Sequence, residues 1–418
     1  MEKNGQKVLS SISLYRCHIL LLLVAAQTLS AIDRVNLSVA GTVLVGQYHY
    51  TPAMLGVMLS ATFWAYTLAQ IAAGPLADWA RSRVTLALCV SVWSFGTILC
   101  GTTTAFVPLI FLRIIVGVGE APGSPGVFRL IAETFSKDLR ATAVGVYFSG
   151  NKIGPAVGLA LCGLILARFG LPWVFYITGA MGLAWVIWFL LIYRGKILIE
   201  EASPPARGKM EWIKLLKHRQ TWGTMLGTGG NFYMLVFYTT WLPSYLVLQR
   251  HISILNSGVI SSLPFIVAVF TTILGGWLSD RFIAGGARVT IVRKSFAIGG
   301  IMSAAIFTVL LAYIDDTSAD IALLALAIGA LGLCTAAVNA VAVDVAPRHL
   351  VSSLTSIQTF GANLIASFAP VITGILISST NNFQLPMLVC AGVAVIVGCG
   401  AYIFIIGDID RPIEMQGP

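Results

Sequence analysis

Five charged residues lie inside long apolar stretches of the chain, where charge is rare: Asp33, Arg34, Arg113, Glu120 and Lys152. Arg113 and Glu120 are seven residues apart, which on a helix is two turns of one face and about 10 Å along the axis. Asp33 and Arg34 are adjacent, so their side chains point about 100° apart and need not pair with each other. The carboxylates can carry protons, and a guanidinium group can bind both oxygens of a carboxylate ligand.

The balance of these charges favours an anionic ligand. With every group ionised, the five residues carry three positive and two negative charges. Protonation of both carboxylates raises the net charge from +1 to +3, so bound protons strengthen the attraction for an anion. The histidines all map to helix ends or loops, which leaves Asp33 and Glu120 as the candidate proton carriers. The alternative is a set of buried ion pairs that only lock helices together.

The overall composition indicates a membrane protein. Charged residues make up 10% of the 418 residues, against about 25% in a typical soluble domain. Hydrophobic residues reach 57%, and the mean hydropathy is +0.87. A soluble protein cannot bury so much apolar side chain and still cover its surface. This excludes a soluble enzyme, a disordered chain and a nucleic-acid-binding protein, in spite of the net charge of +9.

The apolar runs predict an all-α integral membrane protein with twelve transmembrane helices, because about 20 apolar residues cross a bilayer. The uncharged stretch 350–407 is too long for one helix and breaks at the polar segment 378–382. Pro122 and Pro125 predict a bend just after Glu120. The expected spans are 17–46, 52–77, 84–103, 106–128, 140–167, 169–193, 220–249, 252–279, 295–314, 321–343 and two within 350–407.

The basic residues predict the orientation of these helices. With both termini in the cytoplasm, the inner segments hold 21 of the 26 Lys and Arg residues, and the outer loops hold only Arg168 and Arg250. This bias accounts for the net positive charge without any nucleic-acid partner. The seven cysteines are scattered through the apolar runs with no CxxC spacing, which predicts neither a metal site nor a disulfide framework.

A repeated loop motif divides the chain into two halves. Gly74, Asp78 and Arg83 follow the second span, and Gly276, Asp280 and Arg281 follow the eighth, 202 residues later. The glycine permits close helix packing, and the aspartate can pair with basic loop residues and a neighbouring helix end. We expect an N-terminal six-helix bundle over 1–193, a cytoplasmic linker over 194–219 and a C-terminal six-helix bundle over 220–418.

The repeated motif resembles that of the major facilitator superfamily, whose members carry it once per half. The first copy departs from the family pattern, since Trp79 replaces the usual Arg and Arg81 stands where Gly is usual. The resemblance covers nearly the whole chain. It implies two pseudo-symmetric six-helix bundles around a central cavity, which rock to expose that cavity to each side of the membrane in turn.

Two further stretches resemble one subgroup, the anion:cation symporter family. Residues 32–40 look like its D-R-x-N-L-x-x-A pattern, and residues 113–121 are similar to its R-x-x-x-G-x-x-E-A pattern. The span-seven stretch 240–246 fits as well. By this resemblance Asp33 and Glu120 would carry protons, while Arg34 and Arg113 would hold or gate the anion.

Neutral polar residues in the spans could form hydrogen bonds with the rest of the substrate. Tyr66 matches a site tyrosine of sugar-acid symporters, and Asn151 stands where some relatives carry glutamine. Lys152 departs from the family pattern and has three readings: a second anchor for a dicarboxylate, a snorkelling side chain, or a salt bridge to Asp33 or Glu120. Helix–helix hydrogen bonding is the common alternative for the candidates in the second half, which are Asn231, Tyr233, Gln358 and Asn363.

These observations predict a secondary transporter and not an enzyme. We expect it to import an organic carboxylate with protons, most simply a sugar acid such as a hexonate, hexuronate or aldarate. An aromatic-carboxylate symporter and an organic-anion antiporter or exporter of the same fold are the alternatives. A membrane enzyme or a sensor fits less well, because the spans hold no histidine and the chain carries no soluble domain. We expect a monomer in the cytoplasmic (inner) membrane, with protons as the coupling ion and no metal or other cofactor.

Overall fold

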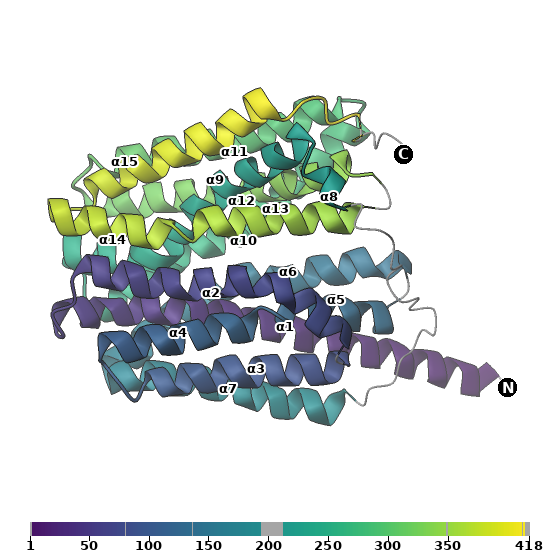
Figure 1. Ribbon diagram of the computed structural model, residues 1–418, viewed down its shortest axis with the longest axis horizontal. Coiled ribbons are helices and arrows are strands. Elements are labelled where there is room, and N and C mark those ends of the chain that lie inside the picture. The colour runs from purple at the N-terminus through teal and green to yellow at the C-terminus, as the bar shows by residue number, and fades with distance from the viewer. Residues whose placement is uncertain are drawn as a thin grey trace.

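A computed structural model describes residues 2–79, 81–135, 137–193, 212–347, 350–411 and 413, and within these the chain is helical without any strand. The predicted all-α fold is confirmed. The expected linker 194–219 lies outside the described residues as far as residue 211. The two ends of the described chain lie on the same side of the helical layer (Figure 1).

The first half of the described chain forms one bundle. Its members are long helices that run back and forth across the same layer (Figure 1). They are α1 (Glu2–Gly46), α2 (Pro52–Trp79), α3 (Ser82–Cys100), α4 (Phe106–Glu120), α5 (Gly123–Thr134), α6 (Lys137–Phe169) and α7 (Leu171–Ile192).

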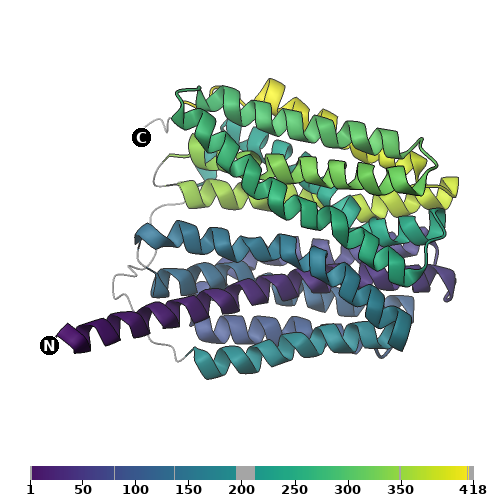
Figure 2. The same ribbon diagram turned by 180° about the vertical axis from the view of Figure 1, so that it is seen from behind.

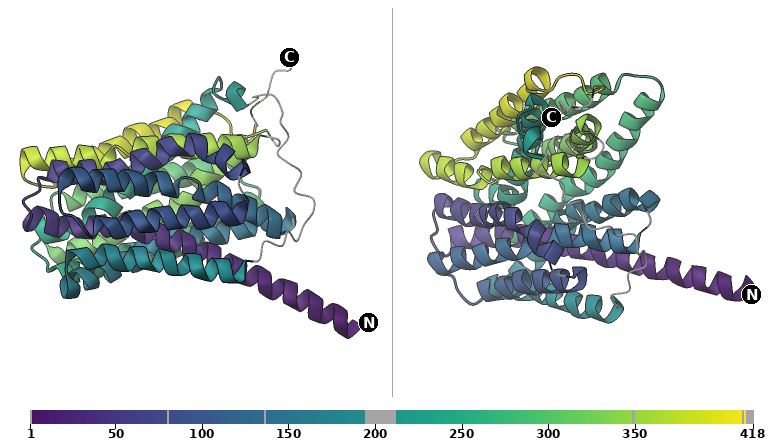
Figure 3. Two further views of the ribbon diagram at one scale, coloured as in Figure 1. Left: turned by 60° about the horizontal axis from the view of Figure 1, so that its bottom comes forward. Right: turned by 45° about the vertical axis from the view of Figure 1, so that its right-hand side comes forward.

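The second half forms a second bundle beside the first, and the views from behind and from the side show the same division (Figures 2 and 3). Its helical segments include three short π-helical stretches, named η. They are α8 (Trp212–Leu215), α9 (Arg219–Ser244), η1 (Tyr245–Gln249), α10 (Ile254–Ala284), α11 (Val289–Leu311), α12 (Thr317–Val345), α13 (Val351–Ala366), α14 (Ala369–Thr380), α15 (Gln384–Val393), η2 (Ala394–Cys399) and η3 (Ala401–Ile405).

Eleven candidate spans in the described residues are long and apolar enough to cross a membrane. The remaining expected span, the seventh (220–249), corresponds to α9, a helix of 26 residues that contains Gly, Thr, Asn and Tyr residues and is therefore less hydrophobic. The span count agrees with the sequence prediction, because apolar length is a local property that the sequence carries directly.

Two spans are interrupted within the membrane. The fourth is divided into α4 and α5 at Ala121 and Pro122, as the prolines predict. The eleventh is divided into α13 and α14 at Ser367 and Phe368, a break that was not predicted. Pro370 explains it, because proline lacks an amide hydrogen and its ring clashes with the carbonyl four residues earlier, at Ala366, where α13 ends.

Glycine pairs bring the two bundles together. Gly163 of α6 packs on Gly258 of α10, and a Cβ on Gly163 would lie 2.9 Å from the Gly258 Cα. Gly56 of α2 packs on Gly374 of α14 in the same way, with 3.1 Å between an added Cβ on Gly374 and the Gly56 Cα. Such small residues let helix backbones approach closely in a membrane, where packing drives association.

The hydrogen bonds between the bundles lie near these glycine pairs. The Ser38 hydroxyl donates to the Thr240 carbonyl at 2.6 Å, and the amide of Val371 donates to the Ser60 hydroxyl at 3.1 Å. Ser38 and Thr240 lie near the C-terminal ends of α1 and α9, and Ser60 lies near the N-terminal end of α2. These helix ends are opposite the chain termini (Figure 1). No hydrogen bond between described residues joins the bundles on the side of the termini.

The second copy of the loop motif forms the expected pairing of its aspartate with a basic residue near the inner loop. Asp280 pairs with Arg293 of α11 at 3.2 Å, and Arg293 also binds Asp344 of α12 at 3.0 Å. Arg281 instead lies over the ring of Trp277, and Gly276 packs near Ala336. In the first copy, Arg83 donates to the Leu190 carbonyl at 2.9 Å. Gly74 and Asp78 belong to α2, and their side-chain contacts lie outside the described part.

The glycine contact between α2 and α14 predicts a sensitive position. A Cβ on Gly56 would lie 2.5 Å from the carbonyl oxygen of Pro370, so Gly56→Leu should lower the melting temperature of the purified protein by several degrees, the effect of about 1–3 kcal/mol of overpacking. Gly299→Leu is the control, because a Cβ there meets no atom within 4 Å. Equal melting of the two variants would mean that this contact does not join the bundles.

The orientation can be tested with a native thiol. Cys17, at the start of the first span, is exposed, and the other six cysteines are buried. If the termini are cytoplasmic, a membrane-impermeant maleimide should label Cys17 in inside-out vesicles and not in right-side-out vesicles. Cys17→Ser should remove the labelling in both. Strong labelling of Cys17 in right-side-out vesicles would reverse the predicted orientation.

Candidate functional site

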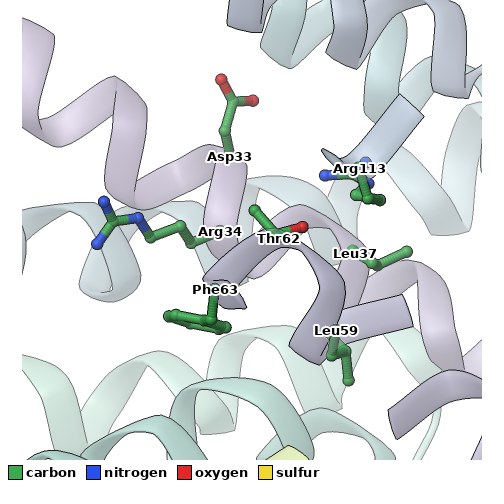
Figure 4. Close-up of a pocket in the computed structure, with 7 residues that line it drawn as sticks. All are labelled: Asp33, Arg34, Leu37, Leu59, Thr62, Phe63 and Arg113. Atoms are coloured by element: carbon green, nitrogen blue, oxygen red, sulfur yellow. The ribbon is translucent and has the colours of Figure 1, made fainter. Parts of the chain in front are cut away.

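Asp33 and Arg34 point in different directions from α1, as their helical spacing requires (Figure 4). Asp33 is 2% exposed and lies inside the first bundle. The Arg34 side chain is 26% exposed. Arg34 precedes Ser38 by one turn on the helix face that contacts α9, so it faces the space between the bundles. Asp33 and Arg34 therefore face different parts of the structure.

Arg34 forms an ion pair with Glu120 of α4. Its Nη2 and Nε atoms lie 2.9 and 3.0 Å from Glu120 Oε2, and the Glu120 side chain is 2% exposed. Glu120 Oε1 has no hydrogen-bond partner among the described residues. The Arg34 guanidinium also lies 4.8 Å from the ring centroid of Tyr66, so the predicted site tyrosine does meet a predicted anion-binding residue.

Asn36 connects Asp33 to Arg113, and it was missed as a site residue. Its amide nitrogen donates to Asp33 Oδ1 at 3.1 Å and to the Thr178 hydroxyl at 3.0 Å. Its carbonyl oxygen accepts from Arg113 Nη1 at 3.3 Å. Asn36 lies one turn after Asp33 on the same helix face, and that spacing was the available signal.

Arg113 is almost fully buried, at 1% exposed, and its guanidinium lies 5.0 Å from the ring centroid of Phe175. Its Nε and Nη2 atoms have no hydrogen-bond partner among the described residues, and neither does Asp33 Oδ2. A buried charged network with unused donors and acceptors is unusual, because unpaired polar atoms cost free energy in a low-dielectric interior. The arrangement can therefore accept a proton or a polar ligand.

Gly117 lies between Arg113 and Glu120 on α4, where the lack of a side chain leaves room beside the helix. In the structure that room is filled by α2, because an added Cβ would clash with the Thr62 carbonyl and lie 2.9 Å from the Ala65 Cβ. The close approach of α2 to α4 brings Tyr66 over Arg34. Gly117 thus shapes the site through helix packing and leaves no space for a ligand.

A small cavity of about 10 Å³ lies beside both arginines and Asp33 (Figure 4). The rest of its wall is apolar except for one hydroxyl. Its lining residues are Asp33, Arg34, Leu37, Leu59, Thr62, Phe63 and Arg113. In this conformation the cavity has room for about one water molecule. Its two cations beside an apolar wall are the groups that a small organic anion would contact in a wider state of the cavity.

The predicted residues of the second bundle separate into two groups. Asn231 and Gln358 are buried and bonded within the bundle: the Asn231 amide donates to the Cys334 sulfur at 3.2 Å, and the Gln358 amide to the Thr228 hydroxyl at 2.7 Å. Tyr233 is two residues from Asn231 and points the opposite way, into the apolar core. Asn363 is partly buried, and its side chain has no partner among the described residues.

The two polar residues of α6 differ in their contacts. Asn151 accepts a hydrogen bond from the Gln27 amide of α1 at 2.6 Å. Lys152 is partly buried, and none of the ion pairs with Asp33 or Glu120 that the sequence allowed is formed. Among the described residues, no three His, Cys, Asp or Glu side chains gather as a metal site would require.

Comparisons with known proteins find transporters that resemble this chain along nearly its whole length. The chain is 31% identical over 407 residues to the D-galactonate transporter of Escherichia coli O6:H1, which covers 91% of this chain and 93% of that protein. It is 27% identical to the hexuronate transporter of Bacillus subtilis 168, in an alignment that covers 94% of this chain and 96% of that protein. Both are curated relatives that span nearly the whole chain.

The fold is shared with solved transporters. A bacterial homolog to the human lysosomal transporter Spinster, in an inward-facing and occupied conformation, superposes with a TM-score of 0.80 at 19% identity, covering 93% of this chain and 96% of that one. The family model of the Major Facilitator Superfamily matches residues 23–360. The chain therefore belongs to the Major Facilitator Superfamily, as a multi-pass membrane transporter and not an enzyme.

Proposed function

We propose that this protein imports a sugar acid together with protons, by alternating access across a bacterial cytoplasmic membrane, with both termini in the cytoplasm. The supporting relatives are named as transporters of D-galactonate and of hexuronate, which are six-carbon acids. One chain would suffice for transport, and protons would be the only coupling ligand. The observation that carries the proposal is the Arg34–Glu120 ion pair beside the cavity.

The ion pair links proton binding to anion binding. When Glu120 is ionised, it occupies two donors of the Arg34 guanidinium through one oxygen. Protonation of Glu120 removes its negative charge and releases the Arg34 guanidinium group. The two N–H donors of that group can then bind both oxygens of a substrate carboxylate. Deprotonation restores the competing carboxylate and weakens the anion site. Proton and anion therefore bind together and leave together, as symport requires.

Asp33 and Arg113 offer a second linked pair. They do not touch, and Asn36 bridges them through its amide group. Protonation of Asp33 would leave the Arg113 charge uncompensated and raise the positive potential of the cavity, which Arg113 also lines. Protonation of Asp33 would thus favour anion binding by raising the positive electrostatic potential of the cavity. Protonation of Glu120 would favour it by releasing the N–H donors of Arg34.

The contacts between the bundles support the alternating step. The glycine pairs and the Ser38–Thr240 hydrogen bond join the bundles toward the helix ends opposite the termini, which the charge bias assigns to the outside. This arrangement fits a state that is closed to the outside. In that state the Arg34–Glu120 pair is formed, as expected after the anion has left for the cytoplasm.

Glu120→Gln should separate binding from coupling. The amide mimics the protonated acid, so the variant should bind substrate with an affinity within a few-fold of the wild type while losing accumulation against a gradient. Binding to purified protein and proton-driven uptake into proteoliposomes measure the two effects. The control is Glu133→Gln, whose carboxylate pairs with Arg129 outside the cavity. Normal accumulation by Glu120→Gln would exclude Glu120 as the coupling group.

The substrate class can be tested by thermal stabilisation at pH 5.5 and 7.5. Ligands that bind the folded state raise its melting temperature. A hexonate, hexuronate or aldarate should do so, and more strongly at pH 5.5, because protons and anion bind together. Stabilisation only by aromatic acids would favour the aromatic-carboxylate alternative. Uptake of the stabilising acid without movement of protons would favour an exchanger or exporter.

A further inference from the structure

Lys152 is a cation within the membrane that lacks an anionic partner. Among the described residues, no carboxylate lies within 4.0 Å of its ammonium nitrogen, and its side chain makes no hydrogen bond. The other two cations of the site are compensated, Arg34 by Glu120 and Arg113 through Asn36 and Asp33. The excess positive charge of the five-residue set therefore resides on Lys152.

The position of Lys152 on α6 directs it toward the second bundle. Gly154 and Gly158 pack against α1, whereas Leu159 and Gly163 contact α10. Lys152 shares its helix face with Leu159 and Gly163, at spacings of seven and eleven residues. Lys152 thus lies on the face of α6 that is turned toward α10 of the second bundle.

The depth of Lys152 differs from that of Arg34. Because Gly158 packs on Ile32 and Val35, Arg34 is level with about residue 157 or 158 of α6. Lys152 is five to six residues nearer the cytoplasm, or about 8 Å along the helix axis. Five carbon–carbon bonds of about 1.5 Å place the terminal carbons of an extended six-carbon chain about 6 Å apart. The positions of the two residues along their helices are therefore staggered by a length comparable to such a molecule.

We propose that Lys152 binds a second carboxylate, so that this transporter prefers dianionic sugar acids, with a carboxylate at each end, over monoanionic ones. The inference rests on the proposed function and narrows its substrate class. Arg34 would bind one end of the molecule after Glu120 is protonated, and Lys152 would bind the other end. An ammonium group suits this task as a compact charge that accepts a range of orientations.

The test compares galactarate with galactonate, which differ only in the group at carbon six. Isothermal titration of the purified full chain at pH 5.5 should give tighter binding of galactarate, by about tenfold to a hundredfold, the range of one charge-assisted hydrogen bond. Lys152→Gln should remove most of this preference, while Lys152→Arg should keep it. Lys294→Gln is the control, because Lys294 donates to the Ile406 carbonyl at 2.6 Å, outside the cavity.

The outcomes distinguish the two proposals. A wild-type protein that binds both acids equally, or a Lys152→Gln variant that weakens both acids by the same factor, would overturn the role of Lys152 and leave the sugar-acid function standing. Absence of binding by either acid to the wild type would overturn both. A melting temperature of Lys152→Gln close to that of the wild type shows that a lost preference does not result from unfolding.

Discussion

The Arg34–Glu120 ion pair is the contact on which the rest of the site depends. A single charge at membrane depth costs about 2.5–3.5 kcal/mol on insertion scales, so it persists only with a partner or a polar cavity. α1 and α4 supply the pair, and α2 covers it with Tyr66 because Gly117 lets the helices approach. A pair that one proton can break is what the proposed coupling of protons to an anion requires.

The charged residues of the site belong to the first bundle, and the facing wall of the second bundle holds neutral polar groups such as Asn231 and Gln358. Close charge pairs thus stay within one bundle, and the proposed movement of the bundles would not break them. The contacts that this movement would change include the glycine pairs, where backbones approach closely. In the proposed cycle, the interface between the bundles would rearrange while the charged network keeps its geometry.

Much of the architecture was predictable from the sequence, because it depends on local properties. Apolar length predicts the spans, the placement of Lys and Arg predicts their orientation, and Pro122 predicts the break after Glu120. The five charges within the spans also indicate the candidate site, since a charge within the membrane costs free energy wherever the chain folds. None of these inferences requires knowledge of which helices touch.

Only the tertiary structure decided the pairing. Glu120 binds Arg34, 86 residues away, and Asp33 reaches Arg113 through Asn36, because the rotation of α1 against α4 is set by packing along their whole length. The same packing fills the space beside Gly117 and leaves Lys152 without a carboxylate partner among the described residues. Residue types and spacings identify the charged residues. Contacts between distant helices determine which of these charges are neutralised and which remain free for a ligand.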